Sequence, residues 1–173
     1  MTTPRKNDPI DSLAEAYEQM LERAVKDAHR NESKAERVLH ELIHDARDKA
    51  VELGELTQHE AERLAKYLAR DLSEATNYLA ESGRELKDWL GFETSLLESE
   101  VIDLLLKAAD DTTVDLILLN AAGQSRSKYL AGEITAPGTL ICDGCGDKLR
   151  IRRTKEIPSC AACLGTSFHR RQT

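Results

Sequence analysis

The chain has 173 residues, of which 40% are hydrophobic, 4% aromatic and 32% charged, and its formal net charge at pH 7 is −7. So few aromatic side chains are unusual for an ordinary globular core, and no apolar stretch approaches the roughly 18 to 20 residues of a membrane span. The composition argues against a membrane protein and favours a soluble chain of elongated helices.

The first twelve residues show no targeting signal. They include Pro4, Arg5, Lys6, Asp8 and Pro9 and contain no apolar run. A secretory signal peptide needs an apolar stretch of about 7 to 15 residues near the start. We therefore expect a cytoplasmic protein.

Apolar residues recur at helical spacing through the first third of the chain. The first stretch of this apolar stripe consists of Leu13, Tyr17, Met20, Ala24 and Ala28. A second stretch consists of Ala35, Val38, Leu42, Ala46 and Leu53. The pattern lapses over residues 29–32, after which Ser33 and Glu36 have capping-box spacing. We expect a long first helix of roughly 30 residues that bends or restarts at this point.

A reversal of the chain is predicted next. Gly54 can take the left-handed conformation that ends a helix, and Thr57 with Glu60 forms a second capping box. The following helix has a heptad seam made of Ala61, Ala65, Leu68, Leu72, Ala75, Leu79, Leu86 and Trp89 or Leu90. The two helices should pair antiparallel in a coiled-coil hairpin on the order of 45 Å long, and the seam could also pair with a second copy.

Two shorter helices are expected beyond the hairpin. They cover residues 94–109 and a segment after the capping candidates Asp111 and Thr112, and a loop follows over 123–127. Together these elements form an acidic helical domain over residues 1–124, with a linker over 125–137. The net charge is −11 for residues 1–137 and +4 for residues 138–173, so the tail differs in sign from the body.

The histidines of the first helix need separate consideration. Residues 40–44 read His-Glu-Leu-Ile-His, the pattern in which metalloproteases place two zinc-binding imidazoles and a catalytic glutamate. At about 100° per residue, His40 and His44 lie nearly opposite Leu42, on the solvated side of the helix. No third ligand stands out among the many carboxylates. We expect no catalysis here and leave open adventitious metal binding by the pair.

The four cysteines carry the clearest chemistry. Cys142 and Cys145 form one Cys-x-x-Cys pair, Cys160 and Cys163 form a second one, and fourteen residues lie between the two pairs. This spacing is typical of a zinc ribbon, in which four thiolates bind one structural Zn²⁺ and leave no position for water or substrate. Disulfides are rare in a reducing compartment, so we expect zinc, with iron and redox use as the alternatives.

The tail from residue 138 to 173 should fold as a β zinc ribbon only with its metal, since about 35 residues cannot bury a sufficient core. Its first glycines suit tight turns, whereas Gly165 comes one position later than usual, which predicts a looser second turn. Period-two alternation places Leu149 and Ile151 inward. The outward face carries a basic ladder of Lys148, Arg150 and Arg152, extended by Arg153, with Lys155, Arg170 and Arg171 nearby.

Several motifs resemble the bacterial YbeL-type zinc ribbon-containing family. They are residues 54–57 (Gly-Glu-Leu-Thr), 128–134 (Lys-Tyr-Leu-Ala-Gly-Glu-Ile), 138–142 (Gly-Thr-Leu-Ile-Cys) and 168–171 (Phe-His-Arg-Arg). The resemblance covers most of the chain. It implies a cytosolic bacterial protein with an N-terminal helical region and a four-cysteine zinc site whose ligands are Cys142, Cys145, Cys160 and Cys163. It implies no activity.

The function expected from these features is binding without catalysis. In one hypothesis the acidic tip of the hairpin, with Glu52, Glu55 and Glu60, reaches a protein partner while the ribbon docks on the same assembly. This architecture is similar to that of DksA-type regulators of RNA polymerase, although their Asp-x-x-Asp-x-Ala tip is absent. In the alternative, the ladder of Lys148, Arg150, Arg152 and Arg153 binds nucleic acid weakly and without sequence preference.

Overall fold

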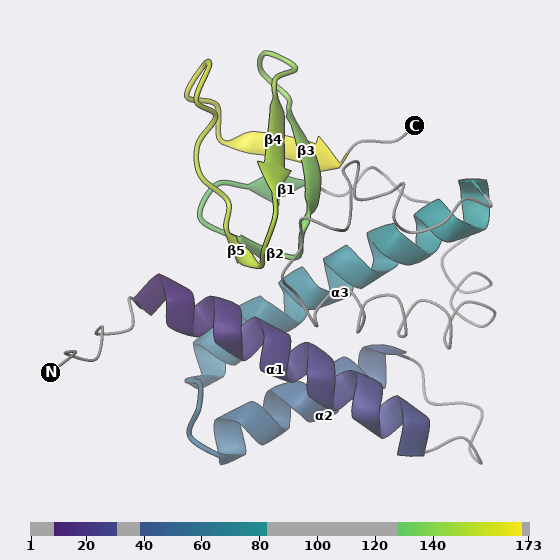
Figure 1. Ribbon diagram of the computed structural model, residues 1–173. Coiled ribbons are helices and arrows are strands. Elements are labelled where there is room, and N and C mark those ends of the chain that lie inside the picture. Colours follow the sequence, from purple (N-terminus) through teal and green to yellow (C-terminus); the bar gives the residue numbers. More distant parts are fainter. Residues whose placement is uncertain (1–8, 31–38, 83–127, 171–173) are drawn as a thin grey trace, which may run out of the picture.

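The computed structural model describes residues 9–30, 39–82 and 128–170, which form three packed helices and a small β-ribbon lying against them (Figure 1). The helices are α1 (Pro9–Arg30), α2 (Leu39–Glu52) and α3 (Gln58–Ser82). The strands are β1 (Tyr129–Leu130), β2 (Ile134–Thr135), β3 (Gly138–Cys142), β4 (Lys148–Ile151), β5 (Lys155–Glu156) and β6 (Ser167–Arg170). Within these ranges, none of the helices has the length and apolar character to cross a bilayer.

The helices do not form the predicted two-helix rod. The predicted long first helix is two helices, α1 and α2, which lie side by side and both contact α3 (Figure 1). The restart after residues 29–32 is therefore confirmed, and the length of roughly 45 Å was wrong. Because α1 and α2 each carry their own apolar stripe, folding back lets each stripe cover the other.

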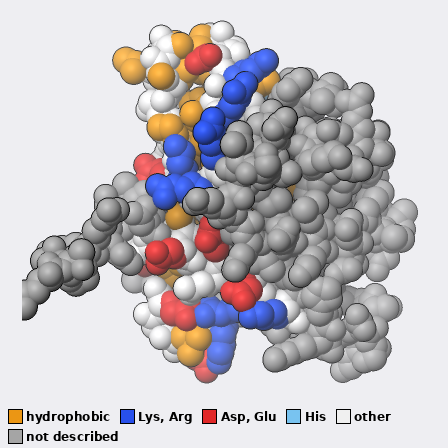
Figure 2. All heavy atoms as spheres, viewed as in Figure 1, with side chains coloured by type: hydrophobic (Ala, Val, Ile, Leu, Met, Phe, Trp, Pro, Cys, Tyr) orange, Lys and Arg blue, Asp and Glu red, His pale blue; other side chains and the backbone are white. Residues whose placement is uncertain are grey.

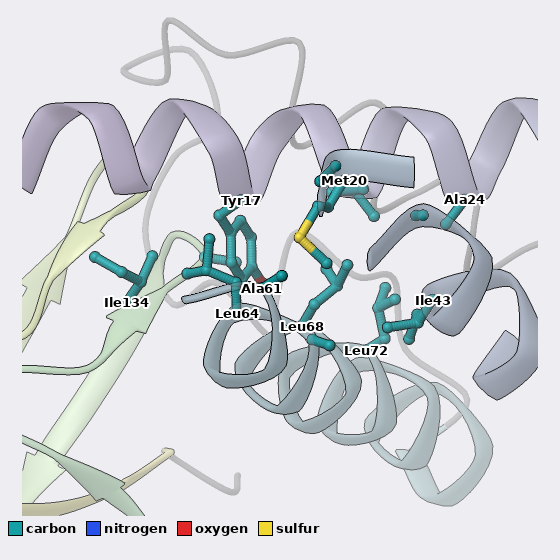
Figure 3. Close-up of a cluster of buried hydrophobic side chains, with 14 of the residues drawn as sticks. Tyr17, Met20, Ala24, Ile43, Ala61, Leu64, Leu68, Leu72 and Ile134 are labelled. Atoms are coloured by element: carbon teal, nitrogen blue, oxygen red, sulfur yellow. The ribbon is translucent and has the colours of Figure 1, made fainter. Parts of the chain in front are cut away.

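The helical core follows the expected periodicity with local shifts. Figure 3 shows α1 contributing Tyr17, Met20 and Ala24, and α3 contributing Leu64, Leu68 and Leu72. The stripe of α2 consists of Ile43, Ala46 and Ala50. Leu53 does not belong to it, because α2 ends at Glu52 and the Leu53 side chain is 53% exposed. Among the stripe positions of α1, α2 and α3 whose side chains the structure describes, all are buried within the chain except the half-buried Leu13.

The reversal between α2 and α3 has the predicted geometry. Gly54 takes φ +70° and donates its amide to the Val51 carbonyl, while Glu55 donates to Ala50, both at 3.0 Å. These two bonds are those of a Schellman C-cap. Thr57 then caps α3, because its Oγ1 accepts the Glu60 amide at 3.3 Å and the Glu60 carboxylate accepts the Thr57 amide at 2.9 Å. The expected antiparallel hairpin is therefore formed by α2 and α3.

The ribbon contains an antiparallel four-stranded sheet of order β1-β6-β3-β4 and a separate β2–β5 pair. The predicted linker over 125–137 was wrong where the structure describes it. Residues 128–137 include β1, which pairs with β6, and β2, which pairs with β5. Short strands in this stretch were missed because their pairing partners lie far along the chain.

Other expectations fall outside the described residues. They are the capping box at Ser33, the seam positions from Leu86 onward, the helices over 94–109 and after Asp111, and the loop over 123–127. These stay predictions. The fold confirmed by the described parts is mainly α, with a helical hairpin and a small C-terminal β-ribbon.

Candidate functional site

Two turns of matching geometry position the four cysteines. In the first, the Gly146 amide donates to the Cys142 carbonyl and the Cys142 amide to the Asp147 carbonyl, both at 2.9 Å. In the second, Leu164 donates to Cys160 at 2.8 Å and Cys160 to Gly165 at 2.9 Å. Each turn thus brings the two sulfurs of one Cys-x-x-Cys pair to the same side. Both turns lie at the end of the ribbon away from the helices (Figure 1).

The second turn is not looser than the first, contrary to expectation. Gly146 takes φ +77° after the first pair, and Leu164 takes φ +60° at the equivalent place after the second. Leucine accepts a left-handed conformation at an energetic cost that glycine avoids. Gly165 serves another purpose, because a Cβ at this residue would lie 3.1 Å from the sulfurs of both Cys142 and Cys163.

The sulfur atoms fit a single tetrahedral ion. All four Sγ atoms lie within 4.8 Å of one another, with Cys142–Cys163 at 3.5 Å and Cys145–Cys160 at 3.6 Å. With Zn–S bonds of about 2.3 Å, tetrahedral geometry requires sulfurs about 3.8 Å apart. Cys142, Cys145, Cys160 and Cys163 are the ligands of one structural zinc site, and they fill its coordination sphere.

Hydrogen bonds act on one ligand of the cage and on a residue beside it. Backbone amides of Cys163 and Ala162 lower the pKa of the Cys160 thiol to about 7, which favours the thiolate that zinc binds. Between the first two ligands, Asp143 ties the first turn to β6. Its amide donates to the Ser167 carbonyl at 3.0 Å, and its carboxylate accepts the Ser167 hydroxyl and pairs with His169 Nδ1 at 2.6 Å. These bonds, Ser167 first, lower the pKa of Asp143.

A zinc-ribbon family model matches residues 16–172, nearly the whole chain and all four cysteines. The chain belongs to the zinc-ribbon containing domain family DUF1451.

The curated relatives agree with this membership. The chain is 25% identical over 162 residues to the uncharacterised protein YbeL of Escherichia coli K12, covering 94% of this chain and 98% of that protein. YbeL of E. coli O157:H7 gives the same identity and coverage. No solved structure matches the chain. The resemblance drawn from the sequence motifs is therefore confirmed, and the comparisons name no activity or partner.

The predicted basic ladder lies on an edge strand. The side chains of Lys148, Arg150, Arg152 and Arg153 are all exposed, whereas Ile151 is buried and Leu149 packs against the ribbon core. Strand β4 pairs with β3, and no second strand in the described part of the chain lies along its other edge. Figure 2 shows Lys and Arg side chains gathered along this part of the molecule, and both acidic and basic side chains over the helices.

One arginine assigned to this surface does not belong to it. Arg170 was grouped with the exposed basic residues, but it is 4% exposed. Its guanidinium lies between the ribbon and the helices, where it donates to Tyr129 Oη at 2.9 Å and to the Pro137 carbonyl at 3.1 Å. The prediction that Arg170 is exposed rested on its charge alone and was wrong, because a guanidinium can be buried where carbonyls and hydroxyls accept its hydrogen bonds. Arg171 lies outside the described residues.

The three carboxylates of the predicted hairpin tip are engaged within the chain. Glu55 makes a two-pronged ion pair with Arg23 of α1, at 2.6 and 2.7 Å. Glu60 belongs to the capping box, and Glu52 pairs with Lys49 at 2.8 Å. The tip is therefore fastened to α1 through Glu55, a contact that could not be seen in the sequence.

The His-Glu-x-x-His motif lies on α2. Glu41 is exposed and His44 is half-buried, while the His40 side chain falls outside the described residues. Among the residues described, the four cysteines are the one cluster of three or more metal-ligating side chains. The motif thus gains no third ligand from the described structure.

Proposed function

We propose that the protein is a non-catalytic binding protein, in which the helices and the zinc ribbon dock together on an anionic macromolecular partner through the basic edge of β4. The observation that carries the proposal is the exposure of Lys148, Arg150, Arg152 and Arg153 on and just beyond a strand with one edge that none of the described strands pairs. Like charges at this density repel each other when nothing neutralises them. A partner of opposite charge would remove this repulsion.

The zinc site supports a binding role. Four protein sulfurs complete a tetrahedral coordination sphere, so the ion has no position at which to polarise a substrate or activate water. Its contribution is to hold β3, β4 and β6 in register and so to present the ladder on a rigid surface. The preferred partner is a protein with an acidic face, because an unpaired strand edge also offers backbone hydrogen bonds to an extended segment.

Affinity capture from a bacterial lysate tests the proposal. The bait proteins are the intact chain, a Cys160→Ser variant, and a Lys148→Glu/Arg150→Glu double variant. A matched control, Arg63→Glu/Lys66→Glu, reverses two exposed charges on α3. We expect the same protein partner with the intact chain and the α3 control, and its loss from the other two. Capture that persists in the β4 double variant would refute this surface.

Nucleic-acid binding through the same ladder is the second candidate. It is favoured by the row of cations and disfavoured by the aromatic residues of the described ribbon, since Tyr129 and Phe168 are both fully buried. Stacking of bases on aromatic side chains is the usual support for single-strand binding. Fluorescence anisotropy with a labelled oligonucleotide at low salt should show weak affinity with a salt slope of about 0.7 to 0.9 per neutralised phosphate. No binding by the zinc-loaded full chain would exclude this candidate.

Docking through the hairpin tip receives less support. Glu52, Glu55 and Glu60 would each have to give up a partner within the chain before meeting a basic surface. A transcription-associated role therefore rests on architecture alone. Retention of RNA polymerase by the intact chain and its loss in Glu55→Lys would restore that role.

A further inference from the structure

The ribbon and the helices meet at a buried carboxylate. Asp71 of α3 is fully buried, and its Oδ2 accepts the Tyr17 hydroxyl of α1 at 2.8 Å. The same oxygen accepts the Ala136 amide at 2.8 Å and the Thr135 hydroxyl at 3.2 Å, both from the ribbon. Asp71 therefore joins α1, α3 and the ribbon at one point.

A buried arginine from the ribbon lies opposite. Arg170 ends β6, and its guanidinium donates to Tyr129, Pro137, Thr135 and Ala136, at 2.9 to 3.2 Å. One terminal nitrogen lies 3.8 Å from Asp71 Oδ1. The space for it depends on Gly138, because a Cβ there would lie 1.7 Å from an Arg170 nitrogen. We call Asp71 and Arg170, with the bridging Thr135 and Ala136, the latch.

A second arginine, from α3 itself, also contacts Asp71. Arg70 donates to Asp71 Oδ1 at 3.1 Å, to the Ile134 carbonyl at 3.1 Å and to the Glu133 carboxylate. Its guanidinium lies 3.9 Å from the centre of the Tyr129 ring. Burial and the Asp71 charge raise the pKa of Tyr17 well above its ordinary value, so this hydroxyl stays a donor. The tyrosine, threonine, amide and two arginines named above thus donate to Asp71 or carry positive charge beside it.

The latch depends on the ribbon, and the ribbon depends on its metal. In the β3–β6 pair, the zinc ligand Cys142 lies opposite Phe168, and Leu140 lies opposite Arg170. A single residue pair, Ile141 with His169, separates the pair that holds the zinc ligand from the pair that holds Arg170. A zinc module of this size is unfolded without its ion. Loss of the metal would then remove Arg170, Thr135 and Ala136 from Asp71.

The helices would be affected by this loss. A buried charge stripped of its partners is strongly destabilising, and Asp71 would remain between α1 and α3 with Tyr17 and Arg70. The helices could relieve this only by opening Asp71 to water, which separates α1 from α3. We propose that the latch transmits the metal state of the ribbon to the helices, so that α1 packs stably on α3 only when zinc is bound.

Thermal unfolding of the full chain tests this inference. Circular dichroism at 222 nm follows the helices, with the protein either zinc-loaded or treated with a chelator under reducing conditions. In the wild type, chelation should lower the helical midpoint by on the order of 10 °C. Hydrogen exchange of peptides from α1 and α3 should quicken in the same sample. An unchanged midpoint after zinc removal would overturn the proposal.

Variants separate the latch from simple contact between ribbon and helices. Arg170→Met removes the cation but keeps Ile134 packed in the helical core, so the zinc-loaded midpoint should fall and the effect of chelation should shrink to less than half. Arg152→Met, an exposed arginine on the same ribbon, should behave like the wild type. A full chelation effect in Arg170→Met with one zinc bound per chain would also refute the latch.

A substitution in α3 tests the latch without changing any residue of the ribbon. Asp71→Leu leaves every ribbon residue in place and removes the buried carboxylate that drives the coupling. It should still bind one zinc per chain, and chelation should shift its helical midpoint by only a few degrees. If Asp71→Leu keeps the full wild-type shift, the coupling does not pass through this carboxylate and the proposal fails.

Discussion

At the scale of single residues, Leu164 occupies a backbone conformation that disfavours its side chain. Its φ is +60°, and the side chain is 77% exposed, so little packing offsets the strain. We predict that Leu164→Gly strengthens the site by up to about 1 kcal/mol, or roughly fivefold in metal retention. Titration with a competing chelator measures this. Leu164→Val should act in the opposite direction, because a β-branched residue tolerates this region poorly. Equal retention in all three proteins would contradict the prediction.

The two glycines beside the cage make a matched pair for a second prediction. A Cβ on Gly165 would lie 3.1 Å from two ligand sulfurs, whereas a Cβ on Gly144 would lie at ordinary contact distances of 3.5 and 3.8 Å. Gly165→Ala should therefore cost about 1 to 3 kcal/mol, since the sulfurs must move to admit a methyl group. Gly144→Ala should retain zinc like the wild type. The same chelator titration compares zinc retention in the two variants. An equal loss of zinc affinity in both would show that the ligand sulfurs can move aside without cost.

At the scale of secondary-structure elements, the start of α3 offers a test in the helical region. Thr57→Ala removes the hydroxyl that caps the Glu60 amide and should lower stability by about 1 kcal/mol, whereas Thr57→Ser keeps the bond. The bonds from Thr57 lower the pKa of Glu60 below 4.5. A lowered pKa stabilises the fold above the unfolded value and loses this effect as the pH falls through the folded value. Urea unfolding should thus show the Thr57→Ala penalty at pH 7 and a smaller one at pH 3.

The elements that could be predicted are those specified by neighbouring residues. The hairpin at Gly54 and Thr57, the alternation at Leu149 and Ile151, and the cysteine cage all follow from spacings of a few positions. The division between α1 and α2 was only half predicted, because a lapse in periodicity shows that a helix stops but not that the chain folds back. Strand β1 escaped notice because two residues carry no alternation.

The latch could not be predicted, since its members lie far apart in the chain. One signal was nevertheless present. Asp71 follows Leu68 by three residues and precedes Ala75 by four, so it occupies a position of the buried stripe. A carboxylate in such a position requires buried donors, and Arg170 is one source of them. Sequence reasoning treated Arg170 as a surface charge because nothing local showed that β6 ends against α3.

At the scale of the whole molecule, the described residues form two apolar cores, and the boundary between these cores does not coincide with the point in the sequence where the net charge changes sign. The ribbon core contains Leu140, Ile157 and Phe168, while Ile134 and Ala136 belong to the helical core although they lie in the ribbon. Figure 3 shows Ile134 beside Leu64 and Tyr17. Residues 134–136 therefore insert into the helices and fix the ribbon to them, and the basic ladder cannot swing freely away from the acidic body.

The same substitution at two buried isoleucines, one in each core, tests the cores separately. Ile134 is 3% exposed in the helical core, and Ile157 is fully buried in the ribbon core. Each change to alanine should cost about 2 to 4 kcal/mol, but at different places. With zinc in excess, Ile134→Ala should mainly lower the helical midpoint measured at 222 nm. Ile157→Ala should mainly lower the chelator concentration that extracts the metal, because the folding energy of the ribbon is part of its zinc affinity. If both variants lost zinc equally and left the helices unchanged, Ile134 would belong to the ribbon alone, and the ribbon would not be anchored in the helical core.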